Sequence, residues 1–288
     1  MHLIRFEHQD RVRLGAMRNG RIVDLSAASN WNLPTDTSAL LSGSGGGLSA
    51  TQKTLDSVTD DDLIDSATVK LLAPVTPGQI LCLGLNYRLH AEESGLEIPE
   101  WPIIFTKSPG SVIADGEPII LPKAAPERVD YEAELVFVIG RQAKNVSKGE
   151  ALDYVAGYTC ANDVSARDLQ FRTSQWTLGK LPDSFCPLGP ALVTADEVPD
   201  PHNLAIRCHL NGQEMQSSNT DDLIFDIPTI IEDLTAYMTL HPGDVVLTGT
   251  PSGVGFARKP PVFLKPGDIV EISIEGLGAL TNPVIGEG

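Results

Sequence analysis

Residues 130–140 read Asp130-Tyr131-Glu132-Ala133-Glu134-Leu135-Val136-Phe137-Val138-Ile139-Gly140. Every side chain from Leu135 to Ile139 is apolar, which predicts a strand buried on both faces, because successive side chains of a strand point to opposite faces. Glu132 and Glu134 are two residues apart and therefore point to the same side of this strand. Two carboxylates at the end of a buried strand need a positive charge nearby. Either a divalent cation or a lysine or arginine side chain would supply it.

A third acid ends the next strand-like run. Residues 154–163 read Tyr-Val-Ala-Gly-Tyr-Thr-Cys-Ala-Asn-Asp, a mostly apolar run that closes with Asp163. With Glu132 and Glu134, this residue offers three carboxylates as possible ligands. Oxygen ligands without a neighbouring histidine or cysteine pair suit Mg²⁺, Mn²⁺ or Ca²⁺ and argue against zinc. The third acid thus favours a divalent metal site over an ordinary ion pair, and such a site leaves positions open for substrate or water.

The composition limits the partners of the chain. Its 288 residues, 42% of them hydrophobic, predict a globular protein with a large core, and its net charge of −17 argues against nucleic acid and anionic membranes as partners. No apolar run reaches the roughly 18 residues of a membrane span, and Met1 leads into charged residues rather than a secretory signal, so we expect a cytoplasmic protein. The cysteines have no metal-ligand spacing, and we expect reduced, buried thiols at Cys82, Cys160, Cys186 and Cys208.

The first part of the chain predicts a small α+β domain. Asn19-Gly20 between two alternating runs predicts a β-hairpin, and residues 33–71 have a loosely helical pattern interrupted by a glycine-rich surface loop at residues 42–47. Residues 72–78 contain two prolines and read as an extended link. We therefore expect a small N-terminal domain at residues 1–72 and a main domain at residues 73–288.

A histidine and a glutamate follow the first strand of the main domain. Residues 80–87 predict an apolar strand and residues 88–93 a helix, on which His90 and Glu93 share a face. The carboxylate can then orient the imidazole as in a general-base pair, although a histidine beside acids is more often simply solvated. Residues 95–102 carry the glycine and prolines of a mobile loop, which is consistent with a lid that brings His90 over a site.

Two lysines are further candidates. Lys107 ends a predicted strand, where lysines are mostly surface charges, and Lys180 lies among apolar and aromatic residues as a candidate site cation or a salt-bridge partner. The last third predicts a hairpin at Asn211-Gly212, a helix at residues 226–240 and two Pro-Gly-Asp turns, at residues 242–244 and 266–268, that each precede a β-branched run. Strands without crossover helices between them predict a mixed or antiparallel sheet.

Several motifs occur in an order that resembles the fumarylacetoacetate hydrolase superfamily. They are Gly-x-Asn-Tyr-x-x-His-x-x-Glu at residues 84–93, Phe-x-Lys at 105–107, Asp-Tyr-Glu-x-Glu-Leu at 130–135, Asn-Asp-Val-Ser-Ala-Arg-Asp-x-Gln at 162–170, Gly-Lys at 179–180 and Thr-Gly-Thr-Pro-x-Gly-Val-Gly at 248–255. The resemblance covers about residues 72–285. Residues 176–190 and 216–220 look most similar to the branch called fumarylacetoacetate hydrolase domain-containing protein 2 and its bacterial relatives.

The resemblance implies a β-rich α+β fold, a mixed β-sandwich or roll with the small N-terminal α+β domain, assembled as a homodimer. It implies Mg²⁺ or Mn²⁺, with Ca²⁺ as a substitute in crystals, held by Glu132, Glu134 and Asp163. By motif position His90 and Glu93 are the catalytic dyad on a lid, with Lys180 beside them. The same comparison places in the substrate pocket Lys107, Gln170 and Thr250.

The family carries out several reactions on 2-oxo acids, so it narrows the reaction without deciding it. The complete His-x-x-Glu pair favours metal-dependent hydrolysis of a C–C bond in acylpyruvate-type 2,4-dioxo acids through an enolate stabilised by the metal. The alternatives are an oxaloacetate decarboxylase or keto-enol tautomerase, a hydroxymuconate-type isomerase or diketo sugar-acid hydrolase, and an inactive binding homologue. The intact set of acids and His90 argues against the inactive homologue.

Overall fold

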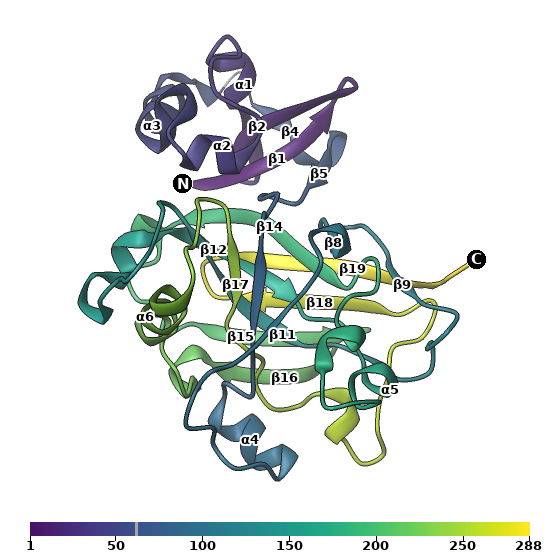
Figure 1. Ribbon diagram of the computed structural model, residues 1–288. Helices are drawn as coiled ribbons and strands as arrows, with labels where there is room; N and C mark the ends of the chain where they lie inside the picture. Colours follow the sequence, from purple (N-terminus) through teal and green to yellow (C-terminus); the bar gives the residue numbers. More distant parts are fainter. Residues whose placement is uncertain (61–62) are drawn as a thin grey trace.

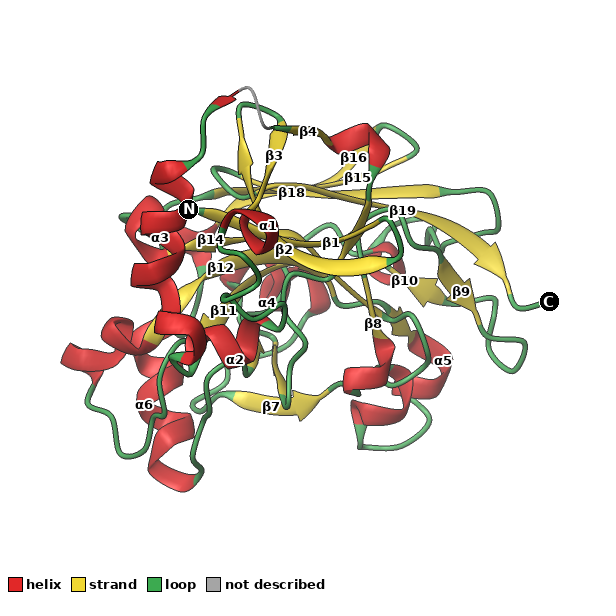
Figure 2. Cartoon of the chain, turned by 90° about the horizontal axis from the view of Figure 1, so that it is seen from above, coloured by secondary structure: helices red, strands yellow, loops and turns green. Residues whose placement is uncertain are grey.

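The computed structural model of the chain describes residues 1–60 and 63–288 and has a strand-rich α+β fold, as predicted (Figure 1). The α-helices are α1 (Leu25–Ala28), α2 (Thr37–Leu41), α3 (Gly47–Ser57), α4 (Arg88–Ser94), α5 (Arg167–Gln170) and α6 (Ile227–Tyr237). Seen from above, α2, α3 and α6 lie on one side of the strands and α5 on the other (Figure 2). None of the helices in the described ranges is long and apolar enough to cross a membrane.

A large mixed sheet forms the centre of the molecule. Its strand order is β4 (Ile64–Asp65), β3 (Arg21–Asp24), β2 (Arg11–Arg18), β1 (His2–His8), β14 (Cys186–Thr194), β12 (Val155–Asn162), β11 (Ala133–Ile139), β17 (Val245–Leu247), β6 (Ile80–Gly84) and β7 (Ile103–Thr106), with β5 (Lys70–Leu72) beside β1 and β8 (Val112–Ile113) beside β14. Most neighbours are antiparallel, while β17 runs parallel to β6 and β8 parallel to β14. The prediction of a mixed sheet is confirmed.

A second sheet packs against one face of the first. Its order is β16 (Gln213–Asn219), β15 (Ala205–Leu210), β18 (Ile269–Ile274), β19 (Gly278–Gly286) and β9 (Ile119–Leu121), and a small pair joins β10 (Val129–Asp130) to β13 (Ser165–Ala166). The strand β11 is fully buried between two apolar clusters, because Leu135 and Phe137 pack toward the second sheet and Val136 and Val138 pack on the opposite face. The strand is therefore covered on both faces, as its sequence predicts.

The elements of residues 1–72 gather at one end of the molecule, at the top of Figure 1. The predicted hairpin at Asn19-Gly20 joins β2 to β3, and both turn residues have positive φ, 53° and 76°. β1 pairs with β14 through His2 and Leu3, so the strands of this region continue the large sheet. The hydrogen bonds between β1 and β14 link this region to the rest of the chain. The domain boundary at residue 72 stays a prediction.

Three further predictions are confirmed. The helix expected at residues 226–240 is α6, which begins after the N-cap Asp226 and ends at Tyr237, and it buries Ile230, Ile231 and Leu234 on one face. The second hairpin joins β15 to β16 through Asn211 and Gly212, whose φ angles are also positive. The cysteines are free and buried at Cys82, Cys160, Cys186 and Cys208.

Candidate active site

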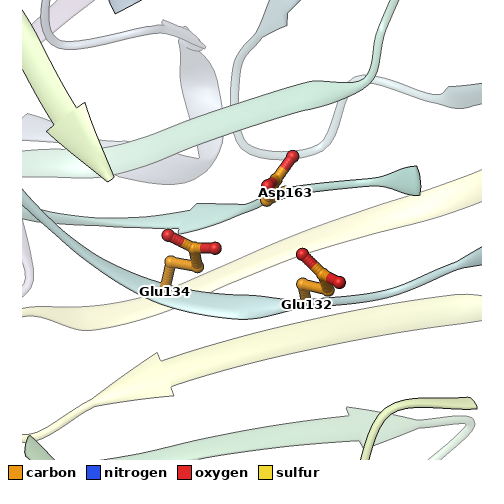
Figure 3. Close-up of side chains that lie close together, drawn as sticks. All are labelled: Glu132, Glu134 and Asp163. Carbon is orange, nitrogen blue, oxygen red and sulfur yellow. The ribbon is translucent and has the colours of Figure 1, made fainter. Parts of the chain in front are cut away.

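Three buried carboxylates lie together at one end of β11 and β12. The two strands are antiparallel, with Ala133 opposite Asn162, so the start of β11 lies beside the end of β12. Figure 3 shows Glu132 and Glu134 on the same side of their strand and Asp163 on the neighbouring one. One oxygen from each residue lies within 4.8 Å of the others. The pairing of these two strands thus brings the three predicted acids together.

Buried cations balance two of these carboxylates. Lys180 Nζ lies 2.8 Å from Glu132 Oε2 and 2.7 Å from Asp163 Oδ2. Arg167 Nη2 lies 2.7 Å from Glu132 Oε1. Although burial by itself raises the pKa of a carboxyl group, Lys180 and Arg167 lower the pKa of Glu132 to about 2. Conversely, Asp163 and Glu132 raise the pKa of Lys180 against the effect of burial.

Glu134 is the carboxylate without such a partner. In the described part of the chain it forms no ion pair, and Glu134 Oε2 accepts a hydrogen bond from the backbone N–H of Gly249 at 2.7 Å. Burial raises its pKa, and the negative charges of Asp163 and Glu132 raise it further. A divalent cation among the three oxygens would supply the missing positive charge, so this donor set fits Mg²⁺ or Mn²⁺.

A small cavity of about 70 Å³ opens beside the carboxylates. Of the predicted site residues, the cavity is lined by His90, Glu132, Glu134, Gln170, Lys180 and Thr250. His90 is 8% exposed, and its Nδ1 atom lies 3.5 Å from Glu93 Oε2, so the two share a face of α4 as predicted. The ring nitrogen Nε2 is then the one left for a bound molecule.

Two side chains that line the cavity have hydrogen-bond donors without a partner in the described part of the chain. Gln170 Oε1 accepts from Arg167 Nη1 at 2.8 Å, which leaves the amide N–H groups of Gln170 for another partner. Thr250 Oγ1 accepts from Gln216 Nε2 at 2.8 Å, which leaves the hydroxyl proton of Thr250 to be donated elsewhere. Both donors are suited to the oxygen atoms of a small acid.

Lys107 lies elsewhere than the sequence suggested. It is 3% exposed and does not line the cavity, and its Nζ atom lies 2.5 Å from Asp163 Oδ1 and 3.2 Å from the carbonyl oxygen of Val164. Its charge is therefore paired with Asp163, and its role toward the substrate stays a prediction. The strand β7 ends at the exposed Thr106, and the next side chain, that of Lys107, is buried.

Sequence reasoning missed the buried pair of Arg167 and Asp130. Arg167 is 2% exposed, and its Nη2 atom lies 2.8 Å from Asp130 Oδ2, while Asp130 Oδ1 also accepts the backbone N–H of Gly255. The available signal was an arginine four residues after Asp163, together with two acids, Asp130 and Glu132, that are two residues apart in the preceding motif. The aromatic lining of the cavity was missed as well, and it has no motif that would reveal it.

The chain is similar to known proteins over nearly its whole length. Residues 79–285 match the family model described as fumarylacetoacetate (FAA) hydrolase C-terminal. A Xenopus laevis protein named oxaloacetate tautomerase fahd2, mitochondrial, is 46% identical, over 99% of this chain and 90% of that protein. The solved structure of fumarylacetoacetate hydrolase from Exiguobacterium antarcticum has a TM-score of 0.87 at 35% identity, with all of both chains covered. Maleylpyruvate hydrolase from Sphingobium sp. SYK-6, solved with manganese(II) and pyruvate, has a TM-score of 0.82 at 31% identity, again with full coverage of both chains.

Proposed function

Since the chain belongs to the fumarylacetoacetate hydrolase family, we propose that it is a divalent-metal-dependent enzyme that interconverts the enol and keto forms of oxaloacetate. The observation that carries this proposal is that His90 and two of the clustered carboxylates, Glu132 and Glu134, line one cavity. The name of the Xenopus relative, at 46% identity, supports the same reaction.

The carboxylates Glu132, Glu134 and Asp163 would hold Mg²⁺ or Mn²⁺, which when bound supplies positive charge that stabilises the developing negative charge of a 2-oxo acid. The Sphingobium maleylpyruvate hydrolase, solved in complex with manganese(II) and pyruvate, supports this choice of metal and ligand class. Lys180 contacts Glu132 and Asp163, and Lys107 contacts Asp163, so these lysines hold two of the carboxylates in place.

The remaining groups handle the substrate and its proton. Gln170 and Thr250 donate hydrogen bonds to its oxygen atoms from their free N–H and O–H groups. His90 exchanges a proton with C3 through Nε2, since Nδ1 faces Glu93. Glu93 orients the imidazole through its contact with Nδ1.

The test follows enol oxaloacetate by its ultraviolet absorbance with purified protein and Mg²⁺. We expect faster loss of the enol than in protein-free buffer, no effect of the protein after EDTA treatment, and recovery when Mg²⁺ is restored. CO₂ release and pyruvate are measured in the same reactions. An enol signal that decays at the buffer rate would contradict the proposal. Release of one CO₂ for each oxaloacetate consumed would show that the protein is a decarboxylase instead.

Hydrolysis of acylpyruvates, the reaction that the sequence motifs favour, is the second candidate. The observation for it is that His90 lines the cavity and has Glu93 beside its Nδ1 atom, an arrangement suited to activating a water molecule. The relative from Sphingobium is named a maleylpyruvate hydrolase. Acetylpyruvate and fumarylpyruvate in H₂¹⁸O distinguish the reactions, because hydrolysis places ¹⁸O in the released acid and tautomerisation leaves the carbon chain intact.

Assembly and location also stay proposals. We propose a homodimer, which light scattering of the purified protein tests directly. The cytoplasmic location predicted from the sequence is one expectation, and the name of the Xenopus relative supports a mitochondrial one instead. Fractionation of cells that express the full chain separates the two.

A further inference from the structure

The outer part of the cavity is apolar. In addition to its polar residues, the cavity is lined by Leu85, Leu96, Phe105, Phe171, Trp176 and Phe256. Phe171 is 52% exposed and Leu96 is 54% exposed, whereas Glu134 is 1% exposed, so these two apolar side chains stand at the mouth and the carboxylates at the closed end. A molecule whose acid group lies at the closed end would extend its other end along this apolar mouth.

The aromatic side chains are held in a fixed arrangement. The rings of Phe171 and Phe256 meet edge to face with centroids 5.7 Å apart, and those of Phe105 and Trp176 do so at 6.1 Å. A Cβ atom on Gly84 would lie 2.2 Å from the Trp176 ring, so the indole occupies space that a side chain at residue 84 would fill. Rings held in this way offer a preformed surface for another ring.

The cations that line the cavity are already paired. Arg167 contacts Asp130 and Glu132, and Lys180 contacts Glu132 and Asp163. Among the lining residues, all of which the structure describes, the outer part therefore has no lysine or arginine left to neutralise a second charge on the substrate. The mouth itself suits an uncharged, apolar substituent, whereas the second carboxylate of oxaloacetate would depend on the neutral donors Gln170 and Thr250.

We propose that the cavity also accepts 2-oxo acids with an aromatic group on C3, and that it interconverts the enol and keto forms of arylpyruvates. This inference rests on the proposed function, because the acid group would occupy the same closed end. In the enol-to-keto direction the O–H proton leaves O2, C3 gains a proton, and the C2=C3 double bond becomes the C2=O2 double bond. No atom is lost and no co-reactant is needed. An arylpyruvate has neither a C4 carbonyl to hydrolyse nor a C4 carboxylate to lose, so only tautomerisation is open to it.

The experiment measures decay of enol phenylpyruvate and enol oxaloacetate with the Mg²⁺-loaded protein. We expect both decays to be accelerated. Phe171→Arg places a free cation at the mouth, and because Phe171 is 52% exposed the variant should fold. We expect its kcat/KM to fall at least about tenfold for phenylpyruvate and to stay equal or rise for oxaloacetate. Trp176→Ala should lower the phenylpyruvate value alone, with Trp176→Phe as the conservative control.

The outcomes separate this inference from the proposed function. Acceleration of oxaloacetate without phenylpyruvate would overturn the inference and leave the proposed function standing. Acceleration of phenylpyruvate alone would support the inference and overturn the choice of oxaloacetate. If neither enol responds, both proposals fail. If phenylpyruvate responds equally in the wild type, Phe171→Arg and Trp176→Ala, the apolar mouth does not select the substrate and the inference is wrong.

Discussion

Both carboxylate oxygens of Glu93 lie 3.0 Å from the backbone nitrogen of Gly253. This contact joins α4, which carries His90, to the segment after β17. Gly253 has a φ of +101°, and a Cβ atom there would lie 2.2 Å from the carbonyl oxygen of Met215, so the position requires glycine. The same segment donates the N–H of Gly249 to Glu134. One segment thus contacts both the histidine-bearing helix and the carboxylate cluster.

We expect Glu93 to have two separable roles, which two substitutions distinguish. Glu93→Gln keeps an oxygen that accepts the Gly253 N–H but loses the charge that faces His90, so kcat should fall about tenfold or more while α4 stays ordered. Glu93→Ala loses both contacts, so hydrogen exchange in residues 88–94 should also become faster. Glu92→Ala, at the exposed neighbouring position, is the control. Unchanged exchange in Glu93→Ala would show that the contact does not hold the helix.

His90→Ala should lower kcat by about 10²-fold or more, because the variant lacks the group that moves the proton at C3. Affinity for Mg²⁺ should stay nearly unchanged, since His90 is not one of the clustered carboxylates. Enol decay and titration calorimetry measure the two quantities. His8→Ala, in β1 and outside the cavity lining, is the matched control. A turnover number like that of the wild type would remove His90 from the mechanism.

The sequence was sufficient to predict the strand β11 and its acids. Glu132 and Glu134 are two residues apart, so they lie on one side of the strand. The apolar residues on both faces predict that the strand is buried. Both conclusions depend on local geometry alone. The hairpins at Asn19-Gly20 and Asn211-Gly212 were predictable for a similar reason, because their turns need positive φ. The placement of Asp163 beside the two glutamates needed the pairing of β11 with β12, which spacing does not give.

The residues whose surroundings the sequence could not reveal depend on contacts between distant segments. Lys107 looks like a surface lysine at the end of a strand, and only the folded chain places its ammonium group against Asp163. Arg167 is buried because Asp130 and Glu132 receive its guanidinium group from another part of the chain. The aromatic lining of the cavity includes Phe105, Trp176 and Phe256, which come from three segments of the chain. No periodicity or turn signal encodes such a combination.

Asp226 gives a prediction for stability against pH. It caps α6 by accepting the backbone N–H of Thr229 at 2.8 Å. Although burial raises the pKa of a carboxyl group, the contacts with Thr229 and Lys148 lower the pKa of Asp226 below its usual 3.8. A lowered folded-state pKa means that the ionised form stabilises the fold above pH 3.8 and that this contribution is lost as pH falls through the folded-state value.

Asp226→Ala should therefore lower the free energy of unfolding by about 1 kcal/mol at pH 7, the usual effect of losing an N-cap. The difference from the wild type should shrink below pH 3.8. Asp226→Asn keeps an oxygen that can cap the helix and should cost less. Urea unfolding across pH 3 to 7 measures these differences, and a constant difference at all pH values would show that the charge of Asp226 does not contribute.

Glu134 gives a prediction in which two effects have opposite signs. Its pKa is raised by burial and by Asp163 and Glu132, so without metal the ionised side chain destabilises the fold increasingly as pH rises above the usual 4.5. Glu134→Gln removes this charge, while its amide oxygen can still accept the N–H of Gly249. In EDTA at pH 7 the variant should therefore have a higher Tm than the wild type, and the difference should shrink toward pH 4.5.

Added Mg²⁺ should reverse that order. The wild type gains stability by binding the ion, about 2.7 kcal/mol at a concentration 100 times Kd, and the variant should gain little because one of its three carboxylates is lost. Calorimetric titration should show the matching loss of affinity, and activity should be lost with it. Glu214→Gln, a glutamate at the surface paired with Arg207, is the control. If Glu134→Gln binds Mg²⁺ with unchanged affinity, Glu134 is not a ligand. If its Tm in EDTA is lower than that of the wild type, the carboxylate stabilises the metal-free fold and the charge argument for the site is wrong.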